Sequence, residues 1–255
     1  MTYPEPIIFI HGLFQTPFAS SVSPFLSPSP VSIPDLPGYG TNRRRDPGDI
    51  SVGAAADSVH AHLHFLGYDK AHLVGHSVGG AVAVIVASRY PEAVASIISV
   101  EGNFTLRDAF WSQQLARMDE READAVLRSY RTDPQAWLAG AGIDATAEQV
   151  ALAERSLAAQ PASTLQAMAR SVVGVTADTS YLQAIAAILD RSIPFHLVAG
   201  ERSRKDWDVP AWVLQRAASM TLQPNAGHMM MLEDQHGFLS IIRQLIPLYG
   251  NQDTS

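Results

Sequence analysis

The strongest constraint on the fold is a glycine-rich hexapeptide that joins a predicted strand to a predicted helix. It reads Gly75-His76-Ser77-Val78-Gly79-Gly80, after the apolar run 71–74 and before the alanine- and valine-rich run 81–90. Gly-x-Ser-x-Gly at such a junction is typical of a nucleophile elbow, a tight turn that raises a serine hydroxyl above a sheet. The two outer glycines leave room where the strand and helix backbones pass closely. The pattern therefore predicts a nucleophilic Ser77 at a helix N-terminus, where the positive end of the helix dipole favours negative charge.

Two further motifs follow apolar runs in the same manner. His11-Gly12 comes after the run 7–10, and Gly227-His228 lies near the C-terminus after the predicted short strand 220–222. With the hexapeptide between them, this order resembles the α/β-hydrolase superfamily over nearly the whole chain, except for about 104–190. The resemblance implies an α/β fold with a mostly parallel, doubly wound sheet and an inserted helical cap. The alternative is a glycine-rich turn that carries a structural serine.

The resemblance also implies roles for particular residues. Ser77 would be the nucleophile and His228 the base that takes its proton. The backbone N–H groups of Leu13, which follows His-Gly, and of Val78 would form the oxyanion hole. Because Leu13 has no side-chain donor, oxyanion stabilisation would depend on the backbone alone, and each fixed donor contributes roughly 3 kcal/mol to lowering the barrier.

The acid of the triad is the point at which this chain departs from the commonest pattern of the superfamily. Most members have Gly-x-x-Asp after the strand that follows the cap, whereas Gly200-Glu201-Arg202-Ser203 has a serine there. Glu101 ends the apolar strand 94–100, where a partly buried carboxylate needs a partner. Some haloalkane dehalogenases carry a Glu at that strand end. We favour Glu101 as the acid, with Asp206 as the alternative if three residues are inserted, and Glu201 behind both.

Residues 104–190 are the predicted insert, since this stretch contains few plausible strands and several helix starts. Asp133-Pro134 and Thr146-Ala147-Glu148 are typical of helix N-termini, and Thr105-Leu106-Arg107-Asp108 resembles a capping box. We therefore divide the chain into a hydrolase core, 1–103 and 191–255, and a helical cap, 104–190. The predicted substrate-binding residues lie around the motifs and in the cap: Phe14, His76, Trp111, Trp137 and Met229.

Two further groups have polar chemistry that we interpret as structural. His60 and His64 are four residues apart on the predicted helix 51–66, a spacing that suits a metal ion, but no third ligand or acidic residue stands beside them. We predict an exposed polar face there and no metal site. Asp35, in a loop rich in proline and glycine, is interpreted as a residue that holds its loop.

Composition excludes several classes of protein. The chain has 255 residues, 47% of them hydrophobic, which is enough for one large α/β domain or a core with an insert. Its net charge is −7, and Arg43-Arg44-Arg45 is its one basic cluster, so nucleic acid is not an expected partner. There is no cysteine, hence no disulfide or thiolate site. The apolar runs are too short to span a membrane, and residues 1–4 lack the basic start of a signal peptide. We expect a cytoplasmic monomer or homodimer whose partner is a small-molecule substrate.

These patterns together predict a serine hydrolase that acts without a cofactor, through an acyl-enzyme, on a small and largely apolar carboxylic ester. The serine at the elbow, where dehalogenases and epoxide hydrolases carry aspartate, argues against alkyl–enzyme ester chemistry. Hydrolysis of a lactone, thioester, amide or C–C bond uses the same groups and stays open, as does a lyase or acyltransferase reaction. A small-molecule receptor that no longer turns over its ligand is the alternative from another class.

Overall fold

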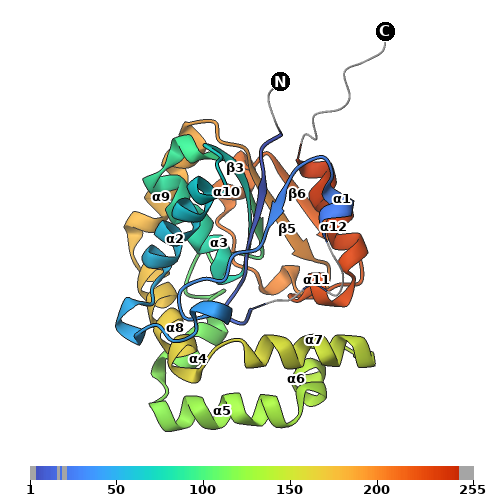
Figure 1. Cartoon of the computed structure of the whole chain (residues 1–255). Coiled ribbons are helices and arrows are strands. Elements are labelled where there is room, and N and C mark those ends of the chain that lie inside the picture. Colours follow the sequence, from blue (N-terminus) through green and yellow to red (C-terminus); the bar gives the residue numbers. More distant parts are fainter. Residues whose placement is uncertain (1–3, 16–17, 19–21, 247–255) are drawn as a thin grey trace.

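A six-stranded parallel sheet forms the centre of the molecule, in the order β2-β1-β3-β4-β5-β6 (Figure 1). The computed structural model describes residues 4–15, 18 and 22–246. Residues 1–3, which belong to the segment 1–4 examined for a signal peptide, lie outside the described part. The strands are β1 (Ile7–Ile10), β2 (Val31–Ser32), β3 (Ala71–His76), β4 (Val94–Val100), β5 (Phe195–Gly200) and β6 (Ser219–Gln223). All five pairings between these strands are parallel, which confirms the predicted α/β class.

Helices cover both faces of the sheet, and the side chains of the central strands therefore alternate between two cores. In β1, Ile8 and Ile10 point into the larger core, whereas Ile7 and Phe9 point into the smaller one. In Figure 1, α2, α3 and α9 lie on one side of the sheet and α1 and α12 on the other. Burial on both faces explains why β1 is an unbroken apolar run and why β3, β4 and β5 are mostly apolar.

The helices have the following bounds. They are α1 (Ser23–Leu26), α2 (Val52–Phe65), α3 (Val78–Arg89), α4 (Phe110–Arg117), α5 (Glu120–Thr132), α6 (Pro134–Gly140), α7 (Ala147–Ala158), α8 (Ala162–Ala177), α9 (Thr179–Asp190), α10 (Ala211–Arg216), α11 (Met230–Glu233) and α12 (Gln235–Leu245). Short 3-10 turns are η1 (Gly40–Asn42), η2 (Pro47–Asp49), η3 (Pro91–Ala93) and η4 (Arg204–Asp206). Within the described ranges, no single helix is long and apolar enough to cross a membrane; α8 and α9 meet the criterion only jointly, across a bend of 73°.

Helices α4 to α9 occupy the chain between β4 and β5, where the insert is predicted. Helix α8 packs against α4 and α5, and α6 packs against α7, whereas α9 lies against α3 of the sheet layer. Figure 1 shows α4, α5, α6 and α7 beyond one end of the sheet. The division of the chain into a core and a cap at residues 103 and 191 stays a prediction.

Helix α3 begins at Val78, directly after Ser77, where the elbow pattern predicts a helix N-terminus. Gly79 and Gly80 are helical, and backbone contacts leave no space for a Cβ on either of them. One local expectation differs from the structure. The Thr105–Asp108 segment does not cap a helix: α4 begins at Phe110, and Asp108 instead accepts hydrogen bonds from the backbone N–H groups of Phe104 and Thr105. The predicted helix starts at Asp133 and Thr146 are confirmed, since each side chain caps its helix.

Candidate active site

Ser77 lies between β3 and α3 in a strained backbone conformation, with φ 53° and ψ −121°. A non-glycine residue with positive φ is uncommon and persists only where its surroundings hold it. Three backbone hydrogen bonds do so: Ser77 N–H donates to Val100 O at 3.0 Å, and Ser77 O accepts from Gly80 at 2.9 Å and from Asn103 at 3.3 Å. The serine therefore has the turn geometry of a nucleophile elbow.

Close backbone contacts around the elbow explain its glycines. A Cβ on Gly79 would lie 2.1 Å from the carbonyl oxygen of Ile10, and one on Gly75 would lie 2.3 Å from the carbonyl oxygen of Gly79. A Cβ on Gly12 would lie 3.1 Å from the Cβ of Ser77. The turn that follows β1 is therefore packed directly beside the serine.

The two predicted oxyanion donors belong to these packed segments. Val78 is the first residue of α3, so its N–H is at the positive end of the helix dipole. Leu13 is buried, and its carbonyl oxygen accepts a hydrogen bond from the hydroxyl of Tyr39 at 2.9 Å. Because Tyr39 is itself fully buried, this bond fixes the orientation of the Leu13 residue.

His228 and Glu101 are in direct contact, with 2.7 Å between His228 Nδ1 and Glu101 Oε2. Glu101 is 5% exposed, and its other oxygen accepts from the Gly200 N–H at 2.9 Å and from the Ser203 hydroxyl at 2.5 Å. Burial raises the pKa of Glu101, but the hydrogen bonds from His228, Ser203 and Gly200 together with the His228 charge outweigh it and hold the pKa below its usual value. Because an ionised carboxylate only accepts, His228 carries its proton on Nδ1 and leaves Nε2 free to accept one.

The other carboxylates that were considered for the acid lie elsewhere. Asp206 is exposed on η4. Glu201 is exposed as well, and its Oε2 accepts from the backbone N–H of Asn225 at 2.9 Å. The geometry thus brings together His228 and Glu101, whereas the Glu201 carboxylate contacts the backbone of Asn225, three residues before His228.

His76 lies beside His228, with 4.7 Å between the ring centroids. Its Nε2–H donates to the carbonyl oxygen of His228 at 2.9 Å. Burial, together with the neighbouring His228, lowers the pKa of His76 to about 3, so its ring is neutral at neutral pH. His76 therefore contacts the histidine loop, and a role in substrate binding stays a prediction.

Three of the predicted substrate-binding residues meet in an aromatic cluster, which we define as Phe14, Trp111, Tyr130 and Trp137. The Phe14 ring centroid lies 5.4 Å from that of Trp137 and 6.5 Å from that of Trp111. The Tyr130 ring centroid lies 5.7 Å from that of Trp111. Tyr130 was not predicted from the sequence, because its contact with the other rings depends on where α5 lies in the fold. Met229 is half-buried and packs against the larger core. The cluster joins the segment after β1 to helices α4, α5 and α6.

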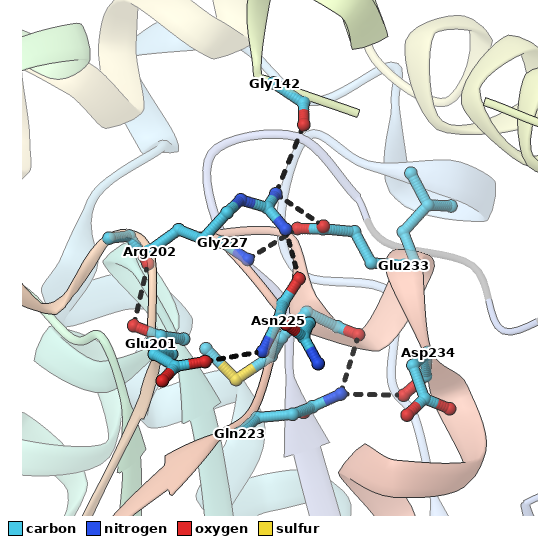
Figure 2. A network of polar contacts seen from close by, with 12 residues as sticks. Gly142, Glu201, Arg202, Gln223, Asn225, Gly227, Glu233 and Asp234 are labelled. Atoms are coloured by element: carbon cyan, nitrogen blue, oxygen red, sulfur yellow. Dashed lines mark hydrogen bonds and ion pairs between the residues drawn. The ribbon is translucent and has the colours of Figure 1, made fainter. Parts of the chain in front are cut away.

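The histidine loop, residues 225–228, is held by side chains that the sequence reasoning did not identify. Figure 2 shows Arg202 and Glu233 around Asn225 and Gly227. The Gly227 N–H donates to Glu233 Oε1 at 2.8 Å, and Arg202 Nη2 donates to Glu233 Oε2 at 2.6 Å. Arg202 lies in the segment 200–203, for which only the acid position was predicted, and Glu233 lies outside the motifs, so neither side chain has a predicted role in the site.

The remaining polar groups have structural contacts. Asp35 accepts from the N–H and the hydroxyl of Thr41, at 2.9 and 2.8 Å, and holds its loop. His60 stacks on Tyr90 with 3.7 Å between centroids and also contacts His64. In the part of the chain that the structure describes, no group of three or more His, Cys, Asp or Glu residues is arranged to hold a metal ion.

Residues 7–241 match the alpha/beta hydrolase family. Since this match covers most of the chain and the sheet has the parallel arrangement described above, the protein belongs to that family.

Among similar proteins, a stretch of 110 residues is 29% identical to Lipase 3 of Moraxella sp. (strain TA144), covering 42% of this chain and 33% of that protein. A stretch of 100 residues is 32% identical to 2-hydroxy-6-oxo-6-phenylhexa-2,4-dienoate hydrolase of Burkholderia cepacia, covering 37% and 35%. The matched segments thus span about a third of the length of these relatives. A thermophilic esterase from Thermogutta terrifontis has the same fold, with a TM-score of 0.70 and 18% identity over 96% of this chain and 90% of that one.

Proposed function

We propose that this protein is a serine hydrolase that cleaves a small, largely apolar carboxylic ester through an acyl-enzyme. The observation that carries the proposal is the 2.7 Å contact between His228 Nδ1 and the buried Glu101 carboxylate, together with the 2.9 Å bond that joins the His228 carbonyl oxygen to His76, the residue before the strained Ser77. A proton on Nδ1 leaves Nε2 as the base, and the carboxylate stabilises the imidazolium that forms when Nε2 takes a proton. Membership of the alpha/beta hydrolase family supports the same reaction class.

In the proposed mechanism, Ser77 Oγ attacks the carbonyl carbon of the ester while His228 Nε2 takes the hydroxyl proton. The carbonyl oxygen becomes an oxyanion, which the N–H groups of Leu13 and Val78 stabilise. The C–O bond to the alcohol then breaks, and His228 returns its proton to the leaving alkoxide. A water molecule, deprotonated by His228, cleaves the acyl-enzyme and restores Ser77. Every step uses groups of this chain and water.

The aromatic cluster supports an apolar substrate. Phe14 is next in sequence to Leu13, so an acyl group held at the oxyanion hole would meet its ring and those of Trp111 and Trp137. Aromatic rings form large apolar surfaces, which are typical of small-molecule sites. In this proposal, the helices that carry Trp111, Tyr130 and Trp137 act as the cap over the site.

The test is hydrolysis of a short-chain p-nitrophenyl ester together with labelling by a fluorophosphonate probe. We expect Ser77→Ala to lower kcat by about 10⁶-fold, because the nucleophile and base act as one unit, and to abolish labelling. Ser240→Ala is a matched control, since Ser240 is exposed on α12 and its hydroxyl donates to the His236 carbonyl of the same helix. A folded wild-type protein that the probe does not label would contradict the proposal and favour a binding scaffold.

A second candidate reaction is C–C bond hydrolysis. It is favoured by the 32% identity to 2-hydroxy-6-oxo-6-phenylhexa-2,4-dienoate hydrolase, whose named substrate carries a phenyl ring, and by the aromatic cluster beside Leu13. Hydrolysis of the bond next to the phenyl ketone releases benzoate. If this compound is the better substrate, kcat/KM for benzoate release should exceed that for the p-nitrophenyl ester, and the reverse order would favour the ester.

A further inference from the structure

The backbone of the histidine loop is fixed by an ion pair at its outer side. Glu233 Oε1 accepts from the Gly227 N–H at 2.8 Å, and Glu233 Oε2 accepts from Arg202 Nη2 at 2.6 Å. The Arg202 guanidinium also donates to the carbonyl oxygens of Asn225 and of Gly142, the latter at 3.2 Å (Figure 2). We infer that Glu233 is a positioning residue for His228 and that Arg202 orients Glu233. This inference rests on the proposed function, in which His228 is the base.

The bond from Glu233 reaches the residue directly before the base. Gly227 is fixed at its N–H by Glu233, and the His228 carbonyl oxygen is fixed by His76 Nε2–H at 2.9 Å. The ring of His228 is fixed in turn by Glu101. The base is therefore held on the N-terminal side, on the C-terminal side and at Nδ1, and of these three contacts the first comes from a residue with no predicted role in the site.

The packing around the loop leaves it little freedom. A Cβ on Gly227 would lie 3.0 Å from Arg202 Nη2 and 3.2 Å from Glu233 Oε1. A Cβ on Gly200 would lie 2.5 Å from the carbonyl oxygens of Ala226 and Gly227. The ion pair thus lies against the Gly227 backbone on one side and the end of β5 lies against it on the other, so movement of Glu233 displaces Gly227 and His228.

The Arg202–Glu233 ion pair is expected to position the histidine loop more than it stabilises the fold. The Arg202 side chain is 43% exposed and that of Glu233 is 11% exposed. Ion pairs with an exposed partner contribute little to the free energy of unfolding. By contrast, an error of about 1 Å in the position of a catalytic group lowers turnover by roughly 10²-fold. Loss of the pair is therefore expected to affect kcat far more than stability.

The same two residues connect the histidine loop to the inserted helices. Arg202 bonds Gly142, in the segment between α6 and α7, and Gln149 Nε2 of α7 donates to the carbonyl oxygens of Leu232 and Glu233 at 3.1 and 3.2 Å. Helix α6 also carries Trp137 of the aromatic cluster. The helix that bears part of the proposed substrate site is thereby linked to the base through Arg202.

The test compares kcat, KM and melting temperature of four variants with a short-chain p-nitrophenyl ester. Glu233→Ala should lower kcat by about 10- to 100-fold with little change in KM. Glu233→Gln should recover most of this loss, because its amide oxygen still accepts from the Gly227 N–H. Arg202→Ala should lower kcat by a smaller factor than Glu233→Ala. Asp190→Ala is the matched control, since it removes a surface ion pair of the same 2.6 Å length, with Arg216, between α9 and α10.

The inference is overturned by a wild-type kcat in Glu233→Ala, by a loss that appears in KM alone, or by Glu233→Gln being as impaired as Glu233→Ala. If Glu233→Ala does not fold, Arg202→Ala decides in the same way: a reduced kcat supports the inference and a wild-type kcat overturns it. Ser77→Ala and His228→Ala are measured alongside. Activity retained by these two defeats the proposed function itself, whereas their inactivity with an active Glu233→Ala defeats only the positioning role.

Discussion

Glu101 keeps a charged side chain in a place that is 5% exposed, and its own backbone is strained, with φ 42°. An isolated carboxylate would not stay ionised there, because burial disfavours the charged form. The hydrogen bonds from His228, Ser203 and Gly200 reverse this effect and hold the pKa of Glu101 below its usual value. The residue is therefore charged at neutral pH, which the proposed orientation of His228 requires.

The assignment of the acid is tested by exchanging each candidate carboxylate for its amide. Glu101→Gln should lower kcat by about 10⁴-fold, because the histidine loses the carboxylate that selects its tautomer and stabilises its charged form. Asp206→Asn should leave kcat unchanged, since Asp206 is exposed on η4. The measurement is ester hydrolysis by both variants in one assay, with circular dichroism as the check on folding. If Asp206→Asn lowered kcat strongly and Glu101→Gln had only a small effect, the acid would be Asp206 and not Glu101.

Ser203 shows what the sequence alone can and cannot predict about the acid of the site. The motif comparison places a serine where most of the family has its aspartate, and it leaves three carboxylates open. The choice depends on β4 and β5 being neighbours, which brings the Ser203 hydroxyl within 2.5 Å of Glu101. A pairing between residues that are about 100 positions apart has no local signal, so the sequence could favour Glu101 as the partner of His228 but could not show that Ser203 and Gly200 also donate to it.

At the scale of the elements, the central strands β1, β3, β4 and β5 followed from their apolar runs, because a strand buried on both faces is mostly apolar. The turn after β4 was different. Thr105 and Asp108 have capping-box spacing, but Asp108 bonds the N–H groups of Phe104 and Thr105, and the Thr105 hydroxyl donates to Asp208 at 2.7 Å. The Thr105 hydroxyl thus bonds a residue 103 positions away in the sequence, in place of the capping contact that the local pattern predicts.

The helices between β4 and β5 lead to a prediction about specificity. Trp111, on α4, is 43% exposed and contacts Phe14 and Tyr130. Trp111→Ala should raise KM for esters with a long or aromatic acyl group by about 10-fold, because contact with one ring contributes about 1 kcal/mol or somewhat more. Acetyl esters, whose acyl group offers only one methyl group to the rings, should be affected much less.

The matched control is Phe65→Ala, which removes an aromatic ring that is 85% exposed at the end of α2. Steady-state kinetics with acetyl, octanoyl and benzoyl esters would check the prediction. Equal effects of the two substitutions on KM for the octanoyl ester would show that Trp111 does not contact the substrate.

At the scale of the whole molecule, the sequence sufficed for the α/β class, the order of the motifs and the presence of helices between β4 and β5. It did not define how these helices meet the sheet, because the aromatic cluster and the Arg202–Glu233 pair each join segments that are distant in sequence. Location and oligomeric state stay predictions. Two other whole-chain properties, the net charge and the buried ionisable groups, govern how stability depends on pH.

The buried ionisable groups act in opposite directions when the pH falls. Burial lowers the pKa of His11 to about 4, so below pH 6.5 the unfolded chain binds a proton that the folded protein does not. His76 acts in the same way, with a pKa lowered to about 3. Burial raises the pKa of Asp108 to about 7, so the folded protein takes up a proton there that the unfolded chain does not bind until lower pH. Between pH 6 and pH 4.5 the two histidines have a larger effect than the one aspartate, so the free energy of unfolding should decrease as the pH is lowered.

His11 offers the sharpest test of this balance. It is 4% exposed, its Nδ1 lies 2.9 Å from the Gly12 carbonyl oxygen, and among the described residues no group bonds its buried Nε2, where a second proton would have to sit. Since the pKa of His11 is lower in the folded state, acidification from pH 7 to pH 4 should destabilise the fold through this residue by roughly 3 kcal/mol. His11→Asn keeps a donor toward the Gly12 carbonyl but cannot take up the proton. In urea unfolding at pH 6 and pH 4.5, the wild type should therefore lose about 1.4 kcal/mol more per pH unit than His11→Asn. Equal slopes for the two proteins would mean that His11 is protonated in the folded state as readily as in the unfolded chain.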